Sequence, residues 1–316
     1  MISKIVVTGA LGHIGSRLVR EFPVSFPGAE IVMIDNLSTQ RFPSLFNLPV
    51  VGRYRFVACD VTTADLVSLF EGAHAVVHLA AMTDAAGSFG RASELEANNF
   101  KATSKVAEAC LATKTRMIHL SSTSVYGTQN EVVLEDCPRE DLKPQSPYAE
   151  VKLKEEDLIR SLSPRLKAVV CRFGTIFGVS PGMRFHTAVN KFCWQAVMGE
   201  PLSVWRTAYD QKRPYLDLTD ACRAIAFILE TDLFDGQTYN VVTVNAAVRD
   251  AIDAIRQYVP KLEVGFVDSP IMNQLSYEVS AQKFRDRGFE FLGALRRGIG
   301  ETISLLRVAH GAAAGF

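Results

Sequence analysis

The chain has 316 residues, of which 48% are hydrophobic and 22% charged, a composition typical of a globular enzyme with a sizeable core. Its formal net charge is zero, so it lacks the basic footprint of a nucleic-acid-binding protein. The six cysteines are scattered without a Cys-x-x-Cys pair or a neighbouring histidine cluster, and no stretch is apolar over a membrane-spanning length. We therefore expect a reducing compartment, no structural metal and no membrane span.

Short apolar runs alternate with amphipathic segments through the first half of the chain. The expected strands cover residues 4–8, 30–35, 54–60, 74–80, 116–121 and 166–173, and the expected helices cover 14–21, 63–70, 94–112 and 147–162. Their near-continuous hydrophobicity indicates strands buried on both faces. This alternation predicts an α/β fold with a Rossmann-type, doubly wound parallel sheet. The first strand begins without a basic leader or cleavage site, so we expect a cytoplasmic protein.

A glycine-rich loop, with Gly9, Gly12 and Gly15, joins the first strand to the first helix. Glycines in this position let the backbone approach a pyrophosphate at the N-terminus of the helix. Asp35 ends the second strand, twenty residues after Gly15, where a carboxylate accepts hydrogen bonds from ribose hydroxyls. A carboxylate there repels a 2′-phosphate, so the pattern predicts NAD rather than NADP. The alternative is a structural turn followed by a helix-capping aspartate.

Tyr148 and Lys152 lie one helical turn apart, on one face of the helix expected at 147–162. Ser146 is a good N-cap and Pro147 suits the first helical position. A neighbouring ammonium stabilises a phenolate, so we expect the pKa of Tyr148 to fall from about 10 toward neutrality and to make it a general base. Alone, such a pair is also typical of a surface aromatic packed on a lysine stem.

The strand and helix pattern loosens after Gly178, where glycines, prolines and isolated aromatics replace it. A further helix is expected at 219–230 and a further strand at 238–243. We predict an NAD-binding Rossmann domain at 1–175 with a return segment at about 216–244. A substrate-binding lobe would comprise 176–215 and 245–310, and residues 311–316 would form a flexible tail.

Beyond the glycine loop and the tyrosine–lysine pair, six further segments carry a family resemblance: 35–39, 60–61, 78–81, 98–103, 121–127 and 172–178. Their order and spacing resemble the extended short-chain dehydrogenase/reductases, and within them the NAD-dependent nucleotide-sugar epimerases and dehydratases, such as the UDP-galactose 4-epimerases. The resemblance covers nearly the whole chain.

The resemblance implies a set of cofactor-binding and catalytic residues. The implied cofactor contacts are Gly9, Leu11, Gly12, His13, Ile14, Gly15, Asp35, Asn36, Asp60, Val61, Leu79, Ala80, Ala81, Asn99, Tyr148 and Lys152. The family's catalytic hydroxyl falls on Ser122, as the third member of a triad with Tyr148 and Lys152. Thr123 and Ser124 remain rivals, because serine-rich strand ends often cap their own backbone.

Two departures from the family pattern narrow the expected chemistry. Sugar 4,6-dehydratases carry an Asp-Glu pair after the catalytic hydroxyl, where this chain has Thr123 and Ser124. The glutamate that precedes Val-Tyr-Gly in UDP-glucuronate decarboxylases is also absent. The remaining chemistry is C4 epimerisation of a nucleotide-diphosphate sugar by transient oxidation to a 4-ketosugar. Alternatives are a net dehydrogenase or ketosugar reductase, an enzyme acting on a substrate without a diphosphate, and a non-catalytic NAD-sensing regulator.

The substrate contacts are less well matched to the family. Arg213 matches one diphosphate-binding arginine, but residues 272–277 lack the second, and Thr175 replaces a substrate-binding asparagine. We hypothesise that Arg184 or Arg206 supplies the missing contact. The expected substrate-binding residues are Thr123, Ser124, Thr175, Arg184, His186, Arg206 and Arg213. The resemblance also implies a homodimer packed through the helices at 94–112 and 147–162.

Overall fold

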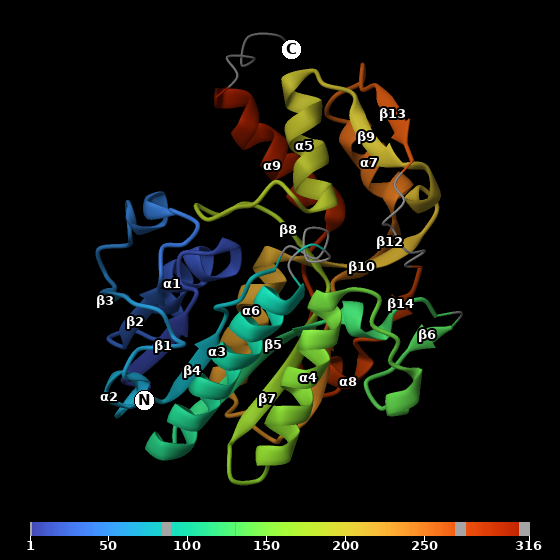
Figure 1. Cartoon of the computed structure of the whole chain (residues 1–316). Coiled ribbons are helices and arrows are strands. Elements are labelled where there is room, and N and C mark those ends of the chain that lie inside the picture. Colours follow the sequence, from blue (N-terminus) through green and yellow to red (C-terminus); the bar gives the residue numbers. More distant parts are fainter. Residues whose placement is uncertain (1, 84–89, 91, 130, 269–275, 310–316) are drawn as a thin grey trace.

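The protein is described by a computed structural model that covers residues 2–83, 90, 92–129, 131–268 and 276–309. Its main sheet is parallel, with the strand order β11-β7-β5-β4-β1-β2-β3 (Figure 1). These strands are β1 (Lys4–Thr8), β2 (Glu30–Asp35), β3 (Arg53–Ala58), β4 (Ala75–His78), β5 (Arg116–Ser122), β7 (Ala168–Phe173) and β11 (Thr238–Val241). The predicted Rossmann-type sheet is therefore confirmed.

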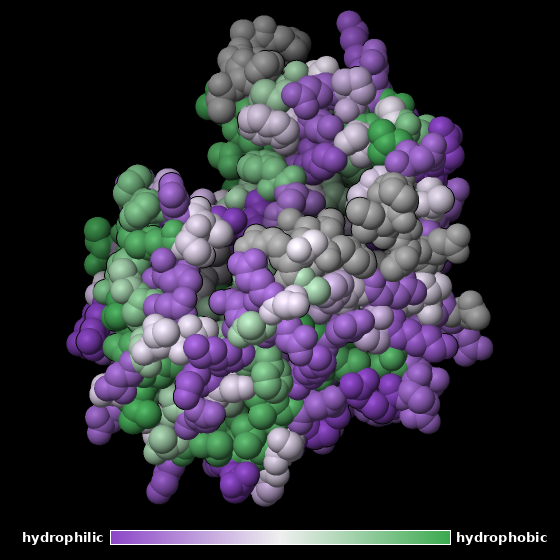
Figure 2. Space-filling view, in the orientation of Figure 1, coloured by the Kyte–Doolittle hydropathy of each residue, from purple (hydrophilic) through white to green (hydrophobic). Residues whose placement is uncertain are grey.

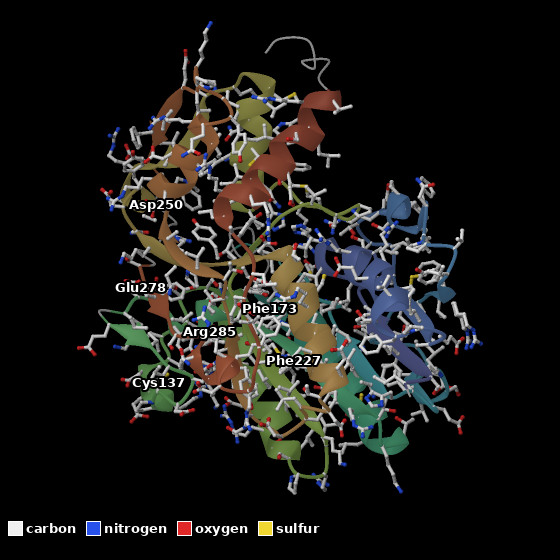
Figure 3. The ribbon with its side chains drawn as sticks, turned by 180° about the vertical axis from the view of Figure 1, so that it is seen from behind. Cys137, Phe173, Phe227, Asp250, Glu278 and Arg285 are labelled. Atoms are coloured by element: carbon white, nitrogen blue, oxygen red, sulfur yellow. The ribbon has the colours of Figure 1, made fainter. Side chains whose placement is uncertain are left out.

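Helices cover both faces of this sheet. The helices α2 (Leu66–Phe70), α3 (Ala92–Thr113) and α4 (Pro147–Leu162) lie on the face turned toward the viewer in Figure 1. The helices α1 (His13–Ser25) and α6 (Leu218–Glu230) cover the opposite face, which Figure 3 shows from behind. This arrangement is the doubly wound layering that the alternation of strands and helices predicts.

Side chains of one strand alternate between the two cores. Ile5 and Val7 pack with α1 and α6, whereas Val6 packs with α3 and α4, and all three side chains are fully buried. Burying one such side chain contributes roughly 1.5–3 kcal/mol to folding. Burial on both faces explains why these strands read as continuous apolar runs. It also fixes the strand ends, from which the site residues project.

Several element boundaries differ from the sequence-based expectation. β3 ends at Ala58 rather than at residue 60, because Asp60 forms a turn in which Thr62 N donates to its Oδ1 at 2.8 Å. The helix expected at 63–70 begins only at Leu66, where the Asp65 carboxylate caps it by accepting from Ser68 N at 3.3 Å. In contrast, α4 has the predicted bounds, since Ser146 caps Ala149 N at 3.2 Å.

A second hydrophobic cluster lies beyond the carboxyl ends of the main strands. It is built largely from the helices α5 (Ala188–Met198), α7 (Val248–Arg256) and α9 (Leu295–Ala309), grouped at the top of Figure 1. The strands that accompany this cluster pair as β12-β10-β8 and β13-β9, whereas the pair β14-β6 belongs to a separate cluster with Tyr126 and Tyr277. They are β6 (Val132–Val133), β8 (Thr175–Phe177), β9 (Leu202–Trp205), β10 (Lys212–Asp217), β12 (Val244–Ala247), β13 (Val264–Val267) and β14 (Glu278–Val279).

One part of the predicted second lobe packs elsewhere. Phe284, in the short helix α8 (Gln282–Arg285), and Phe289 belong to the core between the main sheet, α1 and α6. Their rings lie 5.7 and 5.6 Å from that of Phe227 on α6, which Figure 3 labels. This placement differs from the prediction that 245–310 belongs to the substrate lobe. The physical reason is burial: these phenylalanines complete the apolar layer over α6.

No helix among the described residues is long and apolar enough to cross a membrane. The predicted tail at 311–316 lies outside the described residues. So does most of the stretch 272–277, in which the sequence lacks the expected second arginine.

Candidate active site

A cavity of about 770 Å³ lies at the carboxyl edge of the main sheet, between that sheet and the second cluster. Figure 2 shows the front of the molecule with a notch in its outline between the lower body and the upper lobe. The predicted site residues that line the cavity are Gly9, Gly12, His13, Ile14, Gly15, Leu79, Ala81, Ser122, Thr123, Ser124, Tyr148, Lys152, Thr175, Arg184, His186 and Arg213. The structure thus brings the glycine loop, the carboxyl end of β5 and the tyrosine–lysine pair to one cavity.

The glycine loop is shaped by close backbone contacts. Gly9 has φ 65°, and a Cβ added there would lie 2.7 Å from Ala80 N. A Cβ on Gly15 would lie 2.6 Å from the carbonyl oxygen of Gly9. A larger residue at Gly9 would therefore push the loop away from the segment after β4, and one at Gly15 would push α1 away from the loop. Asp35 braces this loop, because its Oδ2 accepts a hydrogen bond from Leu11 N at 3.1 Å.

The remaining predicted cofactor contacts lie beside this cavity rather than on its lining. They are Leu11, Asp35, Asn36, Asp60, Val61, Ala80 and Asn99. Asn36 Nδ2 donates to Asp60 Oδ2 at 3.1 Å, which joins the ends of β2 and β3. Although burial raises the pKa of Asp60, hydrogen bonds from Thr62 and Asn36 outweigh it and lower that pKa.

Two of these predicted cofactor contacts, Val61 and Asn99, have side chains that are engaged by other parts of the protein. The Val61 side chain is buried in the core beneath α2, so any contact from this residue would use its main chain. Asn99 accepts from Met82 N at 2.8 Å and donates to Met82 O at 2.9 Å. Asn99 therefore fixes the segment that follows β4.

Three consecutive hydroxyl side chains lie at the carboxyl end of β5 and in the turn that follows it, and their partners differ. Ser122 Oγ accepts from Ser124 N at 3.2 Å and from Ser124 Oγ at 2.9 Å, so it caps the turn that follows the strand. Thr123 is buried, donating to Phe173 O at 3.3 Å and lying 3.2 Å from the hydroxyl of Tyr277. Thr123 lines the cavity, but its hydroxyl is engaged by these buried partners, so the partly exposed Ser122 and Ser124 are the hydroxyls better placed to meet a ligand.

Tyr148 and Lys152 lie together on the face of α4 that borders the cavity. Lys152 Nζ is 5.9 Å from the centre of the Tyr148 ring. Burial raises the pKa of Tyr148 above its usual value, and the positive charge of Lys152 opposes this rise without overcoming it. The expected fall of this pKa toward neutrality is therefore wrong for this structure. The main physical reason is burial of the phenol, and Glu155, which forms a 2.9 Å ion pair with Lys152, raises this pKa further.

The loop that follows β8 is anchored on the glycine loop. His13 Nε2 donates to Gly178 O at 2.8 Å, and burial lowers the pKa of His13 to about 4, so its ring is neutral near pH 7. Gly182 N donates to Ser16 Oγ at 2.9 Å, and a Cβ on Gly182 would lie 2.3 Å from Leu11 O. These contacts fix the second lobe against the start of α1.

The predicted substrate arginines are divided between the cavity and the surface. Arg213 lines the cavity, and its Nε and Nη2 are buried without a hydrogen-bond partner among the described residues. Arg184 also lines it and bonds the hydroxyl of Thr83. Arg206 does not line it: this exposed side chain pairs with Asp268 at 3.6 Å and lies over the ring of Phe266. Of the two replacement candidates, only Arg184 therefore faces the cavity.

Some residues at the cavity were not singled out from the sequence. Gln145, Lys191, Tyr215 and Tyr277 line it, and Glu155 lies behind Lys152. Gln145 could have been found from its position just before the Ser146 helix cap. Tyr215 lies two residues after Arg213 and Glu155 three residues after Lys152, so both stand beside residues that the sequence singled out, whereas Lys191 comes from a segment without a motif. No aspartate or glutamate among the described residues lines the cavity.

A family model described as "NAD dependent epimerase/dehydratase family" matches residues 5–242. The chain belongs to this family. YtcB of Bacillus subtilis, named an uncharacterized UDP-glucose epimerase, is 30% identical over 249 residues, which is 75% of this chain and 76% of that protein. The trifunctional RHM1 protein of Arabidopsis thaliana, with UDP-glucose 4,6-dehydratase, epimerase and reductase activities, is 28% identical over 95% of this chain. The chain spans only 46% of the length of RHM1.

Solved structures of the family have the same fold. The UDP-glucuronic acid 4-epimerase of Bacillus cereus, in complex with UDP-glucuronic acid and NAD, has a TM-score of 0.85 and 26% identity. The two alignments cover 97% of this chain and 99% of that one. A UDP-N-acetylglucosamine 4-epimerase of Methanobrevibacter ruminantium has a TM-score of 0.87 at 23% identity, over 98% of this chain and 100% of that one, and supports the fold alone.

NAD is the cofactor of this family, and the residues present fit it. Gly9 and Gly15 give the tight loop at the N-terminus of α1 that a pyrophosphate requires. Asp35 and Asn36 stand at the end of β2, where the adenosine ribose binds in this fold. Tyr148 and Lys152 border the other part of the cavity. The predicted choice of NAD is confirmed.

Proposed function

We propose that this family member is a C4 epimerase acting on a nucleotide-diphosphate sugar. The observation that carries the proposal is that Ser122, Tyr148 and Lys152 meet at a cavity lined by no described acidic side chain. Bound NAD supplies reversible hydride acceptance. The protein must then supply a base for the sugar hydroxyl and a site for the diphosphate, and this cavity offers both.

The catalytic residues have separate tasks in this proposal. The phenolate of Tyr148 accepts the proton of the C4 hydroxyl and later returns it. Ser122 holds the reacting oxygen by a hydrogen bond, and the positive charge of Lys152 favours the phenolate. After the 4-ketosugar forms, it must turn within the pocket so that hydride returns to its opposite face.

Elimination of water is less well supported than epimerisation. It needs a carboxylic acid and a base beside the sugar, but the two residues after Ser122 are Thr123 and Ser124. Thr123 is held by Phe173 O and Tyr277. Relatives such as RHM1 include dehydratase and reductase activities, so product analysis has to separate the three reactions.

The test is to incubate the purified protein with UDP-, GDP-, dTDP- and CDP-sugars, with and without added NAD. We expect interconversion of C4 epimers, identified by NMR, without net formation of NADH. Loss of water, detected by mass spectrometry, would indicate a dehydratase. NADH appearing or disappearing in step with the sugar would indicate a dehydrogenase or a ketosugar reductase. No conversion of any nucleotide sugar would point to a substrate without a diphosphate or to a non-catalytic NAD sensor.

Arg213 provides a prediction about substrate affinity. Arg213→Ala should weaken binding of the nucleotide sugar about 10–100-fold, because charge-assisted hydrogen bonds contribute roughly 1.5–3 kcal/mol. Titration calorimetry with the nucleoside diphosphate measures this change directly. Arg206→Ala is the matched control and should leave affinity within about twofold, since Arg206 does not line the cavity. Equal effects of the two changes would contradict the assignment of Arg213.

A homodimer remains an expectation from the family resemblance. The outer faces of α3 and α4 form a shallow surface hollow, and hydrophobic residues are interspersed with hydrophilic ones over this side of the lower body (Figure 2). The hollow is lined by Glu96, Phe100, Lys154, Asp157, Leu158 and Ser161. Sedimentation velocity at micromolar concentration tests this expectation, and a monomer alone would count against it.

A further inference from the structure

Glu155 is a buried carboxylate directly behind the tyrosine–lysine pair. It lies three residues after Lys152 on α4, and its Oε2 accepts from Lys152 Nζ at 2.9 Å. The side chain of Glu155 is fully buried and that of Lys152 is 6% exposed. A buried ion pair that includes a proposed catalytic lysine affects the charge available to Tyr148.

A second basic group contacts the same carboxylate from the sheet. His119 on β5 places its Nε2 3.3 Å from Glu155 Oε2, and neither side chain is exposed. The His119 ring stacks on that of His78 on β4, with 6.1 Å between their centres. His78 is fixed in turn by the hydroxyls of Thr8 at 2.8 Å and Thr103 at 3.2 Å. The carboxylate is thus enclosed by buried side chains of β4 and β5 and is not exposed at the surface.

The titratable and charged groups around the pair come from several elements. On α4 they are Glu155 and Glu156, of which Glu156 is committed to Arg172 on β7 at 2.7 Å. β5 contributes His119 and β4 contributes His78, whose pKa burial lowers to about 3. The loop before α5 contributes Arg184, whose charge acts on Tyr148. From α3, which packs on α4, the charged contact is the exposed pair of Glu96 with Lys154.

Two opposing effects set the ionisation of this group of residues. Burial alone would lower the pKa of Lys152, but Glu155 and Tyr148 outweigh it and raise that pKa. Burial alone would raise the pKa of Glu155, but Lys152 and His119 bring it to about 2. Lys152 and Glu155 are therefore both charged across the neutral range. The carboxylate then cancels part of the field that Lys152 exerts on the Tyr148 phenol.

We propose that Glu155 is a positioning residue that holds the Lys152 ammonium in place and, by partly neutralising it, sets the pH at which Tyr148 becomes a base. This role rests on the proposed function, in which Tyr148 takes the proton of the sugar hydroxyl. Glu155 does not line the cavity. It acts by holding Lys152 and through the effect of its charge on Tyr148, and His119 Nε2 lies 3.3 Å from the same carboxylate.

The test removes the negative charge of Glu155 and keeps the shape of its side chain. In Glu155→Gln, an amide oxygen can still accept from Lys152, while the negative charge is gone. We expect the pKa of Tyr148 to fall by about half a unit or more, because an uncompensated ammonium favours the phenolate. Ultraviolet absorbance of the phenolate against pH measures this, after subtraction of the same titration with Tyr148→Phe added. The acidic limb of kcat/KM should move to lower pH by a similar amount.

Two further variants separate this role from a structural one. Glu155→Asp keeps the charge, so its acidic limb should stay near that of the wild type even where kcat falls. Glu135→Gln removes another buried carboxylate, which accepts from Asn240 N at 2.7 Å away from the cavity, and should leave the limb unchanged. A Tyr148 pKa that is unchanged or higher in Glu155→Gln would overturn the proposal.

A measurement on the wild-type protein covers the case in which Glu155→Gln does not fold. The carboxyl ¹³C resonance of Glu155, assigned by comparison with Glu155→Asp, should not titrate between pH 4 and pH 8. Titration within that range would mean that the carboxylate does not neutralise Lys152, and would overturn the proposal. Both spectroscopic titrations need no substrate. They therefore test the role of Glu155 even if no nucleotide sugar is converted.

Discussion

Tyr148→Phe should lower kcat by about 10²–10⁴-fold, because it removes the only group proposed to take the proton of the sugar hydroxyl. Affinity for NAD should stay within a few-fold, since the glycine loop and Asp35 are unchanged. Steady-state rates with the substrate found by product analysis, together with calorimetric titration of NAD, measure the two quantities. Activity within a few-fold of wild type would refute the role of Tyr148 as the base.

Tyr126→Phe is the matched control for the loss of a tyrosine hydroxyl. The Tyr126 hydroxyl donates to Asn240 Oδ1 at 2.8 Å and accepts from Arg172 Nη1 at 2.8 Å, but it does not line the cavity. Its loss leaves buried partners unsatisfied and should lower the free energy of unfolding by about 1–3 kcal/mol. The folded variant should keep kcat within a few-fold. An equally inactive Tyr126→Phe would mean that activity is lost through misfolding rather than chemistry.

The fold of the first half could be predicted because its signals are local. Strands buried on both faces give uninterrupted apolar runs. The start of α4 is marked by an N-cap serine, Ser146, followed by Pro147. Errors occurred where a polar side chain replaced the regular hydrogen bonding. Asp60 and Asp65 form a turn and a cap, and this shortened β3 and α2 relative to the apolar pattern.

The small sheets outside the main sheet were harder to predict, because their strands pair with partners that are distant in the chain. β9 pairs with β13 and β6 with β14, and these strands are only two to four residues long. No local period can reveal such pairings. The same holds for Phe284, whose aromatic contacts with Phe227 cross the boundary assumed between the lobes. Sequence position alone therefore placed this segment in the wrong core.

The candidate site shows the same division between local and distant information. The spacing of Tyr148 and Lys152 is a property of one helix and was predicted from the sequence. The pKa of Tyr148 also depends on burial of the phenol, which only the packing of α4 in the folded protein determines. Arg206 was chosen from its residue type, but whether it faces the cavity depends on the packing of β9 and β13. Motifs identify which residues can react, whereas packing decides how their charges are balanced.

The buried pair of Arg172 and Glu156 gives the largest expected effect on stability. Arg172 donates from Nε at 2.9 Å and from Nη2 at 2.7 Å to the two Glu156 oxygens, and both side chains are at most 2% exposed. Ser121 Oγ also donates to Glu156 Oε1 at 2.5 Å, so the pair ties α4 to the ends of β5 and β7. Glu156→Gln leaves a buried, uncompensated guanidinium. It should lower the free energy of unfolding by about 3–5 kcal/mol, measured by urea denaturation.

The adjacent residue on α4 supplies the control for this change. Asp157 pairs with Arg139 at 2.8 Å, but both side chains are near half-exposed, so Asp157→Asn should cost less than about 1 kcal/mol. Replacing both buried partners, as Glu156→Leu with Arg172→Met, should recover much of the stability lost in Glu156→Gln, because no charge is then left unpaired. If the double variant were less stable than Glu156→Gln, the hydrogen bonds of the pair to Ser121 and Tyr126 would outweigh the cost of burying its charges. The pair would then stabilise the strand ends beneath Ser122 through geometry rather than through charge balance.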